Sequence, residues 1–131
     1  MARNQSPQLA AGGNISPATF VKVSTAAPNT GLPAGANEAV VGISGLDVRA
    51  AATLDGTSTT HHAISTENIM LFGLGDVCLL KIGAGGCTAG DRLKSDGSGN
   101  GVLIATSGTA QNVGAIALQT VAVDEYCLVQ V

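Results

Sequence analysis

Short apolar runs alternate with glycine-rich turns through the second half of the chain. The runs with this pattern are residues 68–72, 76–82, 92–94, 101–104, 113–118 and 125–131. Two earlier runs, 19–23 and 39–43, are also rich in residues that favour strands. No stretch carries the periodicity of a long amphipathic helix. Short strands at fairly even spacing are typical of a small sandwich or barrel, so the sequence predicts an all-β fold.

One glycine-rich stretch, GDRLKSDGSGNG at residues 90–101, raises two alternatives, a phosphate-binding loop and a hairpin turn. A phosphate-binding loop leads into a helix whose first N–H groups hold the anion. Here the apolar run GVLIA follows instead. Residues 95–101 lie between two predicted strands, so we expect a hairpin connection in which glycines supply positive φ angles.

The last predicted strand is apolar on both faces. Because side chains alternate along a strand, three of its residues share one face and three share the other. The two sets are Cys127, Val129 and Val131, and Tyr126, Leu128 and Gln130. A strand with this pattern is expected to turn one face to the core and the other to a partner rather than to water.

The chain is expected to form one domain with an N-terminal arm. Residues 1–17 are polar and rich in Ala, Gly and Gln, as a flexible arm would be. Residues 18–131 form the single β domain, in which 31–38 is expected to be loop. Residues 46–66 form a long irregular loop, and such loops in compact domains are usually functional or interfacial.

The composition predicts a thin hydrophobic core. Hydrophobic residues make up 45% of the 131 residues, but aromatic residues make up only 2%, and there are 18 glycines. Each buried position therefore removes little apolar area from water, while glycine loses much entropy on ordering. We expect the protein to gain stability from neighbouring subunits or from a larger surface.

The low content of charged residues bears on whether the protein binds nucleic acid or a membrane. Only 11% of residues are charged and the net charge is −3. The cations are scattered and aromatic residues are few, so the sequence offers neither a basic stripe for phosphates nor rings on which bases could stack. We therefore expect no nucleic-acid partner. No apolar run approaches the roughly 20 residues that span a bilayer, and the N-terminus has no apolar segment of the secretory type. We therefore expect synthesis in a cytoplasm and no membrane partner.

The residues capable of chemistry do not form a recognisable catalytic or metal-binding motif. Cys78, Cys87 and Cys127 are odd in number and lack C-x-x-C spacing, so buried structural thiols are expected rather than disulfides or a metal site with His61 and His62. The adjacent carboxylates at 124 and 125 diverge, unlike a facing catalytic pair. We expect no cofactor and no enzymatic activity, although a Cys–His pairing in space is not decided by sequence.

Several runs together resemble the small capsid cement, or head decoration, proteins of tailed bacteriophages, of the β-tulip type. The runs that carry the resemblance are ISP at 15–17, FVKV at 20–23, VGIS at 41–44, GDVCLL at 75–80, TAGDRLKSDG at 88–97, VGAIAL at 113–118 and the closing strand. The loop 46–66 departs from the family pattern.

The resemblance implies a structural virion protein on the outer surface of an assembled capsid. Such a protein would bind the major capsid protein and copies of itself, as trimers or dimers, and would stabilise the shell by bridging subunits. The arm and the long loop are the expected contacts, with Arg3 and Arg49 facing acidic capsid surface. The full set of expected contact residues is Arg3, Gln5, Leu9, Asn14, Arg49, Leu54, His61 and His62.

A β-sandwich module that binds glycans or another ligand, on a virion or cell-surface fibre, is the alternative. Sugar sites usually stack rings on exposed aromatic side chains. Only Phe20, Phe72 and Tyr126 are available for this, so composition favours the cement interpretation.

Overall fold

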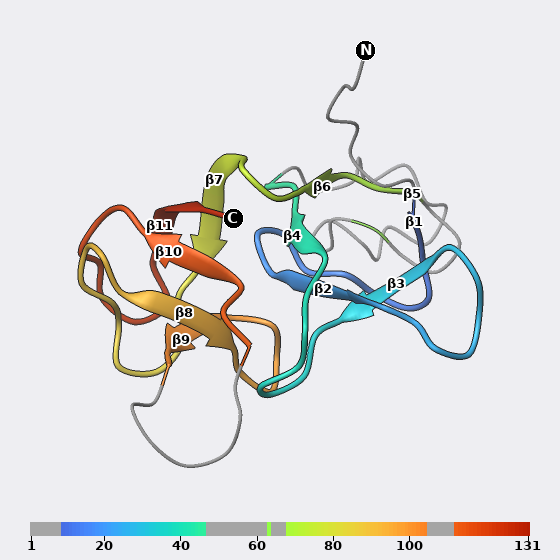
Figure 1. The fold of residues 1–131 in the computed structure, drawn as a ribbon, viewed down its shortest axis with the longest axis horizontal. Coiled ribbons are helices and arrows are strands. Elements are labelled where there is room, and N and C mark those ends of the chain that lie inside the picture. The colour runs from blue at the N-terminus through green and yellow to red at the C-terminus, as the bar shows by residue number, and fades with distance from the viewer. Residues whose placement is uncertain (1–8, 47–62, 64–67, 105–111) are drawn as a thin grey trace, which may run out of the picture.

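Two β-sheets account for the regular structure of this chain (Figure 1). The computed structural model describes residues 9–46, 63, 68–104 and 112–131. Those residues contain eleven strands and no helix. The all-β prediction is therefore confirmed.

The first sheet has six strands and closes almost into a barrel. Its order is β5-β1-β3-β2-β4-β6. The strands are β1 (Leu9–Ala11), β2 (Phe20–Val23), β3 (Thr30–Pro33), β4 (Gly42–Ser44), β5 (Asn68–Ile69) and β6 (Leu71–Phe72). The two edge strands β5 and β6 are separated in sequence by Met70 alone, so one short segment borders both edges of the curled sheet.

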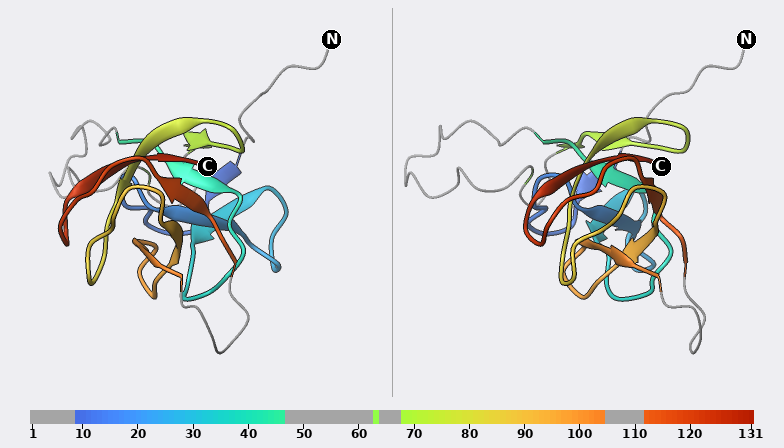
Figure 2. Two further views of the ribbon diagram at one scale, coloured as in Figure 1. Left: turned by 60° about the vertical axis from the view of Figure 1, so that its left-hand side comes forward. Right: turned by 90° about the vertical axis from the view of Figure 1, so that its left-hand side faces the viewer.

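The second sheet has five antiparallel strands in the order β7-β11-β10-β8-β9. The strands are β7 (Val77–Lys81), β8 (Arg92–Ser95), β9 (Gly101–Leu103), β10 (Ala115–Ala117) and β11 (Tyr126–Gln130). The pairing of β7 with β11 spans five residues on each strand, and the two ribbons lie alongside each other in Figure 2. The C-terminal strand is thus an internal strand of this sheet.

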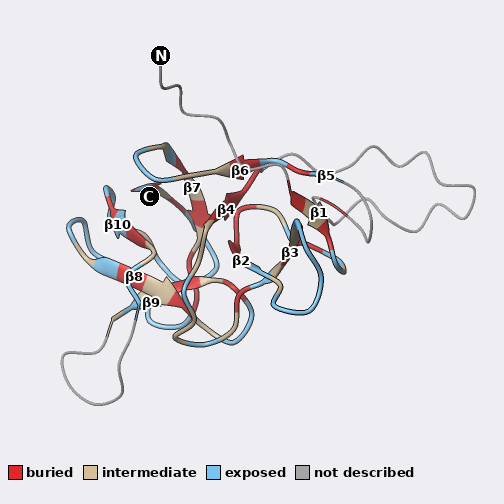
Figure 3. Cartoon of the chain, turned by 45° about the vertical axis from the view of Figure 1, so that its right-hand side comes forward, coloured by how far each residue is buried: buried red, intermediate tan, exposed pale blue. Residues whose placement is uncertain are grey.

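The core consists of two clusters that meet at β2. One cluster packs Phe20 and Ile43 of the first sheet against residues of the second sheet that include Leu80 and Val129. The other fills the curled first sheet around Val21. Successive residues of a strand point to opposite faces, so Phe20 and Val21 enter different clusters. Figure 3 shows buried residues on β2, β4 and β7, where the two sheets approach each other.

The loop after β3 links the first sheet to the second through hydrogen bonds. The N–H of Asn37 donates to the carbonyl oxygen of Ser95 at 3.1 Å, and Lys94 Nζ donates to Asn37 Oδ1 at 2.6 Å. The Ser95 hydroxyl donates to Ala34 O at 3.1 Å. In the same loop, a hydrogen bond from Lys22 lowers the pKa of Glu38, with help from the Gly35 N–H. The sequence predicts loop over residues 31–38, whereas the structure places residues 31–33 in β3.

The predicted hairpin at 95–101 is confirmed, since it joins the antiparallel strands β8 and β9. Asp96 Oδ1 accepts hydrogen bonds from the N–H groups of Ser98 and Asn100 at 2.7 and 3.0 Å. Gly99 has a φ of 87°, which a side chain would disfavour. Its carbonyl oxygen accepts the Phe20 N–H at 2.8 Å, so the turn also contacts the first sheet.

The N-terminal segment differs from the predicted arm over the residues that the structure describes. Residues 9–11 form β1, which pairs with β3 in parallel and with β5. Ile15 is fully buried and forms a bridge to Ala63. These pairings join segments distant in sequence, so the polar local composition did not reveal them. Residues 1–8 lie outside the described residues.

We expect Ser44→Ala to lower the free energy of unfolding by about 1–3 kcal/mol. Ser44 is fully buried, and its hydroxyl accepts the Thr19 N–H at 3.1 Å and donates to Ser16 O at 2.7 Å. The substitution leaves that N–H without its partner. Urea unfolding followed by circular dichroism measures the effect, with the more exposed Ser24→Ala as control. Equal stability of the two variants would contradict the prediction.

Candidate interaction face

The side of the second sheet that faces away from the core carries residues that are exposed or half-buried. Along β7 and β11 the buried residues alternate with more exposed ones. The outward positions of the sheet are Val77, Leu79, Lys81, Arg92, Lys94, Val102, Ile116, Tyr126, Leu128 and Gln130, and Leu118 continues the outward row of β10. We call these residues the outer face. The predicted alternation of the last strand is confirmed.

The centre of the outer face is apolar. Leu79 lies opposite Leu128 in the β7–β11 register, and the Leu118 N–H donates to Leu128 O at 2.8 Å. Leu79 on β7, Leu128 on β11 and Leu118, the residue after β10, therefore form a row. Ile116 and Leu118 remain 44% and 42% exposed, and Val77 remains 51% exposed. Large apolar side chains gathered in this way usually mark a surface that meets another molecule.

Cations border this apolar centre. Lys81 lies opposite Tyr126, and Arg92 lies opposite Ile116. The remaining cation, Lys94, is held by Asn37. None of the outward strand positions carries a carboxylate, although the whole chain has a net charge of −3. The outer face is therefore suited to a partner surface that is apolar at its centre and acidic at its border.

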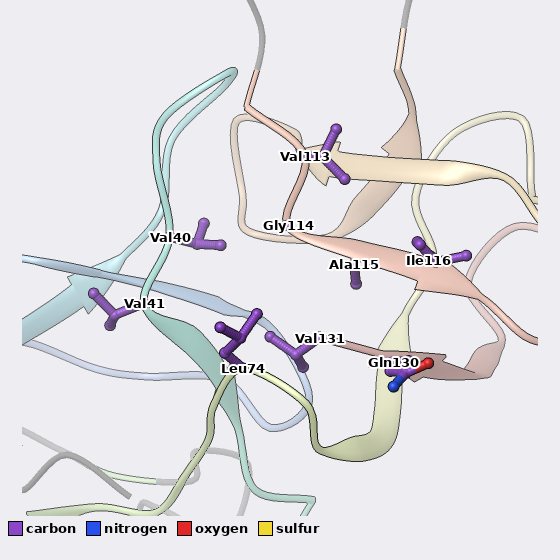
Figure 4. Close-up of a pocket in the computed structure, with 9 residues that line it drawn as sticks. All are labelled: Val40, Val41, Leu74, Val113, Gly114, Ala115, Ile116, Gln130 and Val131. Atoms are coloured by element: carbon purple, nitrogen blue, oxygen red, sulfur yellow. The ribbon is translucent and has the colours of Figure 1, made fainter.

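A pocket of about 490 Å³ continues the outer face at one end. Figure 4 shows that its walls come from the segment before β4, the turn before β7, the segment leading into β10 and the C-terminus. The lining residues are Val40, Val41, Leu74, Val113, Gly114, Ala115, Ile116, Gln130 and Val131. Ile116 and Gln130 belong to both surfaces. Leu74, at its rim, is 89% exposed. Such a pocket accepts apolar side chains and offers little polar chemistry.

The structure places two of the contact residues expected from sequence. Leu9 is only 7% exposed and pairs with Ile69 inside the first sheet, so it packs in the core instead of reaching a partner. Asn14 is exposed and stays a prediction. The other six, Arg3, Gln5, Arg49, Leu54, His61 and His62, lie outside the described residues.

The three cysteines are buried and free. Burial, and secondarily the charge of Asp76, raise the pKa of Cys78 to about 11. Burial also raises the pKa of Cys87 to about 11, with a contribution from its hydrogen bond with Cys127. Thiols with such pKa values are weak nucleophiles at neutral pH.

The other groups considered for chemistry are dispersed. Glu125, in the exposed turn before β11, accepts the Ala122 N–H at 2.9 Å, which is a turn-stabilising contact. Within the described part of the chain, no three His, Cys, Asp or Glu side chains gather as metal ligands would. Nor does that part contain a helix long and apolar enough to cross a membrane.

Comparison with known proteins identifies a fold likeness only. No family model matches the chain. No curated protein matches it either. The structure of the head fiber gp8.5 N base of bacteriophage phi29 is similar, with a TM-score of 0.50 and 14% sequence identity over 95% of this chain and 91% of that one. The chain thus has a fold similar to that of the base of a phage head fibre.

Proposed function

We propose that this protein is a structural component of a bacteriophage head, bound to another head protein through its outer face. The observation that carries the proposal is the fold likeness to a head-fibre base over nearly the whole chain. The resemblance of its sequence runs to capsid cement proteins points in the same direction. An apolar face bordered by cations supports a permanent protein contact.

The protein would be synthesised in the host cytoplasm and would lie on the outer surface of the assembled shell. It would bind the major capsid protein, bridge its subunits and associate with copies of itself, as a trimer or a dimer. Many copies at symmetry-related positions stabilise a shell because binding to the assembled form shifts the equilibrium towards it. The role is structural, without catalysis.

A glycan-binding module of a fibre is the second candidate. Its support is that the similar structure belongs to a fibre and that Tyr126 is 43% exposed on the outer face. Phe20 is fully buried and is not available to stack on a sugar ring. A glycan array discriminates this candidate from the first.

Co-sedimentation of the purified protein with empty expanded heads and with immature heads, both from the phage that encodes it, tests the proposal. A variant lacking residues 1–8 measures the contribution of the N-terminus. A deletion of 1–17 is unsuitable, because it removes β1 and the buried Ile15. Binding to expanded heads is the expected result. A folded protein that binds neither head would overturn the proposal.

Leu118→Asp should weaken binding to heads at least about tenfold, because a charge buried in an apolar contact without a partner costs several kcal/mol. The control is Val23→Asp on the first sheet, since Val23 is 46% exposed and Leu118 is 42% exposed. Equilibrium sedimentation with a dilution series of heads measures both affinities. Equal loss in both variants, or no loss in Leu118→Asp, would exclude the outer face as the contact.

A further inference from the structure

Two buried cysteines, 40 residues apart in sequence, meet in the second sheet's core. Cys87 Sγ and Cys127 Sγ are 3.6 Å apart. Both thiols also point to one carbonyl oxygen, that of Gln119, at 3.6 Å from Cys87 and 3.5 Å from Cys127. The two sulfur atoms are therefore in contact, with no side chain between them.

The backbones on either side hold this arrangement in place. Cys87 and Val121 exchange two hydrogen bonds of 3.0 and 3.1 Å. The Gln119 side chain accepts the Leu128 N–H at 3.0 Å, which fixes the segment 119–121 to β11. Cys127 lies within β11 itself, opposite Leu80. These backbone contacts keep the two sulfurs close to each other, and a disulfide bond needs them to approach further, to about 2 Å.

The third cysteine provides an internal reference. Cys78 lies on β7 opposite Val129, and it is buried on the same inner face of the sheet. The residue Cys78 is 6% exposed, as is Cys87. A reaction that selects by exposure alone would treat these two cysteines alike, whereas one that needs a neighbouring sulfur would select Cys87 and Cys127.

We infer that Cys87 and Cys127 form a dithiol site that closes to an intramolecular disulfide when the folded protein meets a peroxide. The Cys87 thiolate attacks one peroxide oxygen, the O–O bond breaks, and one water leaves after protonation, so that Cys87 becomes a sulfenic acid. The Cys127 sulfur then attacks the Cys87 sulfur and a second water leaves. The protein loses two electrons and two protons, and hydrogen peroxide becomes two waters.

The chemistry sets the expected rate. The high pKa of Cys87 keeps the reactive thiolate scarce at neutral pH. Below that pKa the thiolate fraction rises with pH, so closure should be about tenfold faster at pH 8 than at pH 7. The neighbouring sulfur should capture the sulfenic acid before a second peroxide oxidises it further.

The disulfide would connect β11 to the segment before β8, around a loop that contains β8, β9 and β10. A cross-link over a loop of this length restricts the unfolded chain. Oxidised protein should therefore melt at least about 5 °C above reduced protein.

The experiment treats native, reductant-free protein with hydrogen peroxide at pH 7 and pH 8, then removes the peroxide, unfolds the protein and alkylates its free thiols. Intact mass and peptide mapping count and locate the alkylated cysteines. We expect one alkylated residue, Cys78, and full reversal by dithiothreitol. Cys78→Ser should still form the bond, and Cys127→Ser should not.

Several results would overturn the inference. They are alkylation of all three cysteines in folded, peroxide-treated wild type, a disulfide that includes Cys78, a cross-link between chains on a non-reducing gel, or Cys87 oxidised to sulfinic acid with Cys127 free. Circular dichroism of each serine variant before treatment establishes that it is folded. If Cys127→Ser does not fold, the position of the disulfide in wild type and in Cys78→Ser is sufficient to test the inference.

Discussion

Phe20→Ala is expected to lower the free energy of unfolding by about 3–5 kcal/mol. Phe20 is fully buried on β2, yet it belongs to the cluster formed with the second sheet. A Cβ on Gly114, beside β10, would lie only 2.6 Å from the Phe20 ring, which shows how closely the ring is enclosed. Removing the ring leaves a cavity between the sheets that rigid strands cannot close.

The size of this effect follows from the scarcity of aromatic residues. The sequence contains two Phe, one Tyr and no Trp, so no other large ring is available to fill the space. Because domains of this size have a total stability of about 5–15 kcal/mol, the variant should be partly unfolded near physiological temperature. Urea unfolding and thermal melts measure it.

The matched control is Val23→Ala on the same strand. Val23 is 46% exposed, so its truncation should change stability by less than about 0.5 kcal/mol. If Phe20→Ala were as stable as this control, the packing between the two sheets would not be the main source of stability, and the two-cluster description of the core would be wrong.

Gly42→Ala should cost about 3 kcal/mol, at the upper end of what overpacking usually costs. A Cβ at this position would collide with the backbone carbonyl oxygen of Phe72. Gly42 lies on β4, which pairs with β6 through Ile43 and Phe72. Because the obstacle is backbone, no side-chain rotation relieves it, and the strands must separate where the first sheet approaches closure.

The control for this variant is Gly13→Ala, since a Cβ on Gly13 would meet nothing within 4 Å. Urea midpoints of the two variants and of wild type give the comparison, and protection of the Phe72 region from hydrogen exchange localises the effect. A Gly42→Ala protein as stable as Gly13→Ala would mean that β4 and β6 are less closely packed than the structure has them.

The local pattern of apolar residues and turns was sufficient to predict the positions of most strands. Residues 76–82 and 125–131 were predicted as strands, and β7 and β11 lie within them. Strands β1 and β3 were missed. β3, Thr30–Pro33, contains Gly and Pro, which disfavour strands locally. Its hydrogen bonds with β1 and β2 stabilise it nonetheless, and such long-range pairing leaves no trace in a short window of sequence.

The outer face, too, was predictable only in part from sequence. The alternation of Tyr126, Leu128 and Gln130 was readable from one strand, because side-chain direction has a period of two. The remaining residues of the outer face join it only through the strand order β7-β11-β10-β8-β9. That order places Arg92 beside Ile116 and Leu118 beside Leu128. A contact surface assembled across strands is a property of the pairing register.

By itself, therefore, the sequence determined the all-β class, the hairpin at 95–101 and the two-sided apolar character of the last strand, since these follow from propensity, turn chemistry and period. Only the tertiary structure decided that residues 9–11 belong to a sheet, that Cys87 and Cys127 touch, and that cations border one apolar face. The physical reason is that burial and pairing energies depend on distant residues, which backbone topology alone brings together.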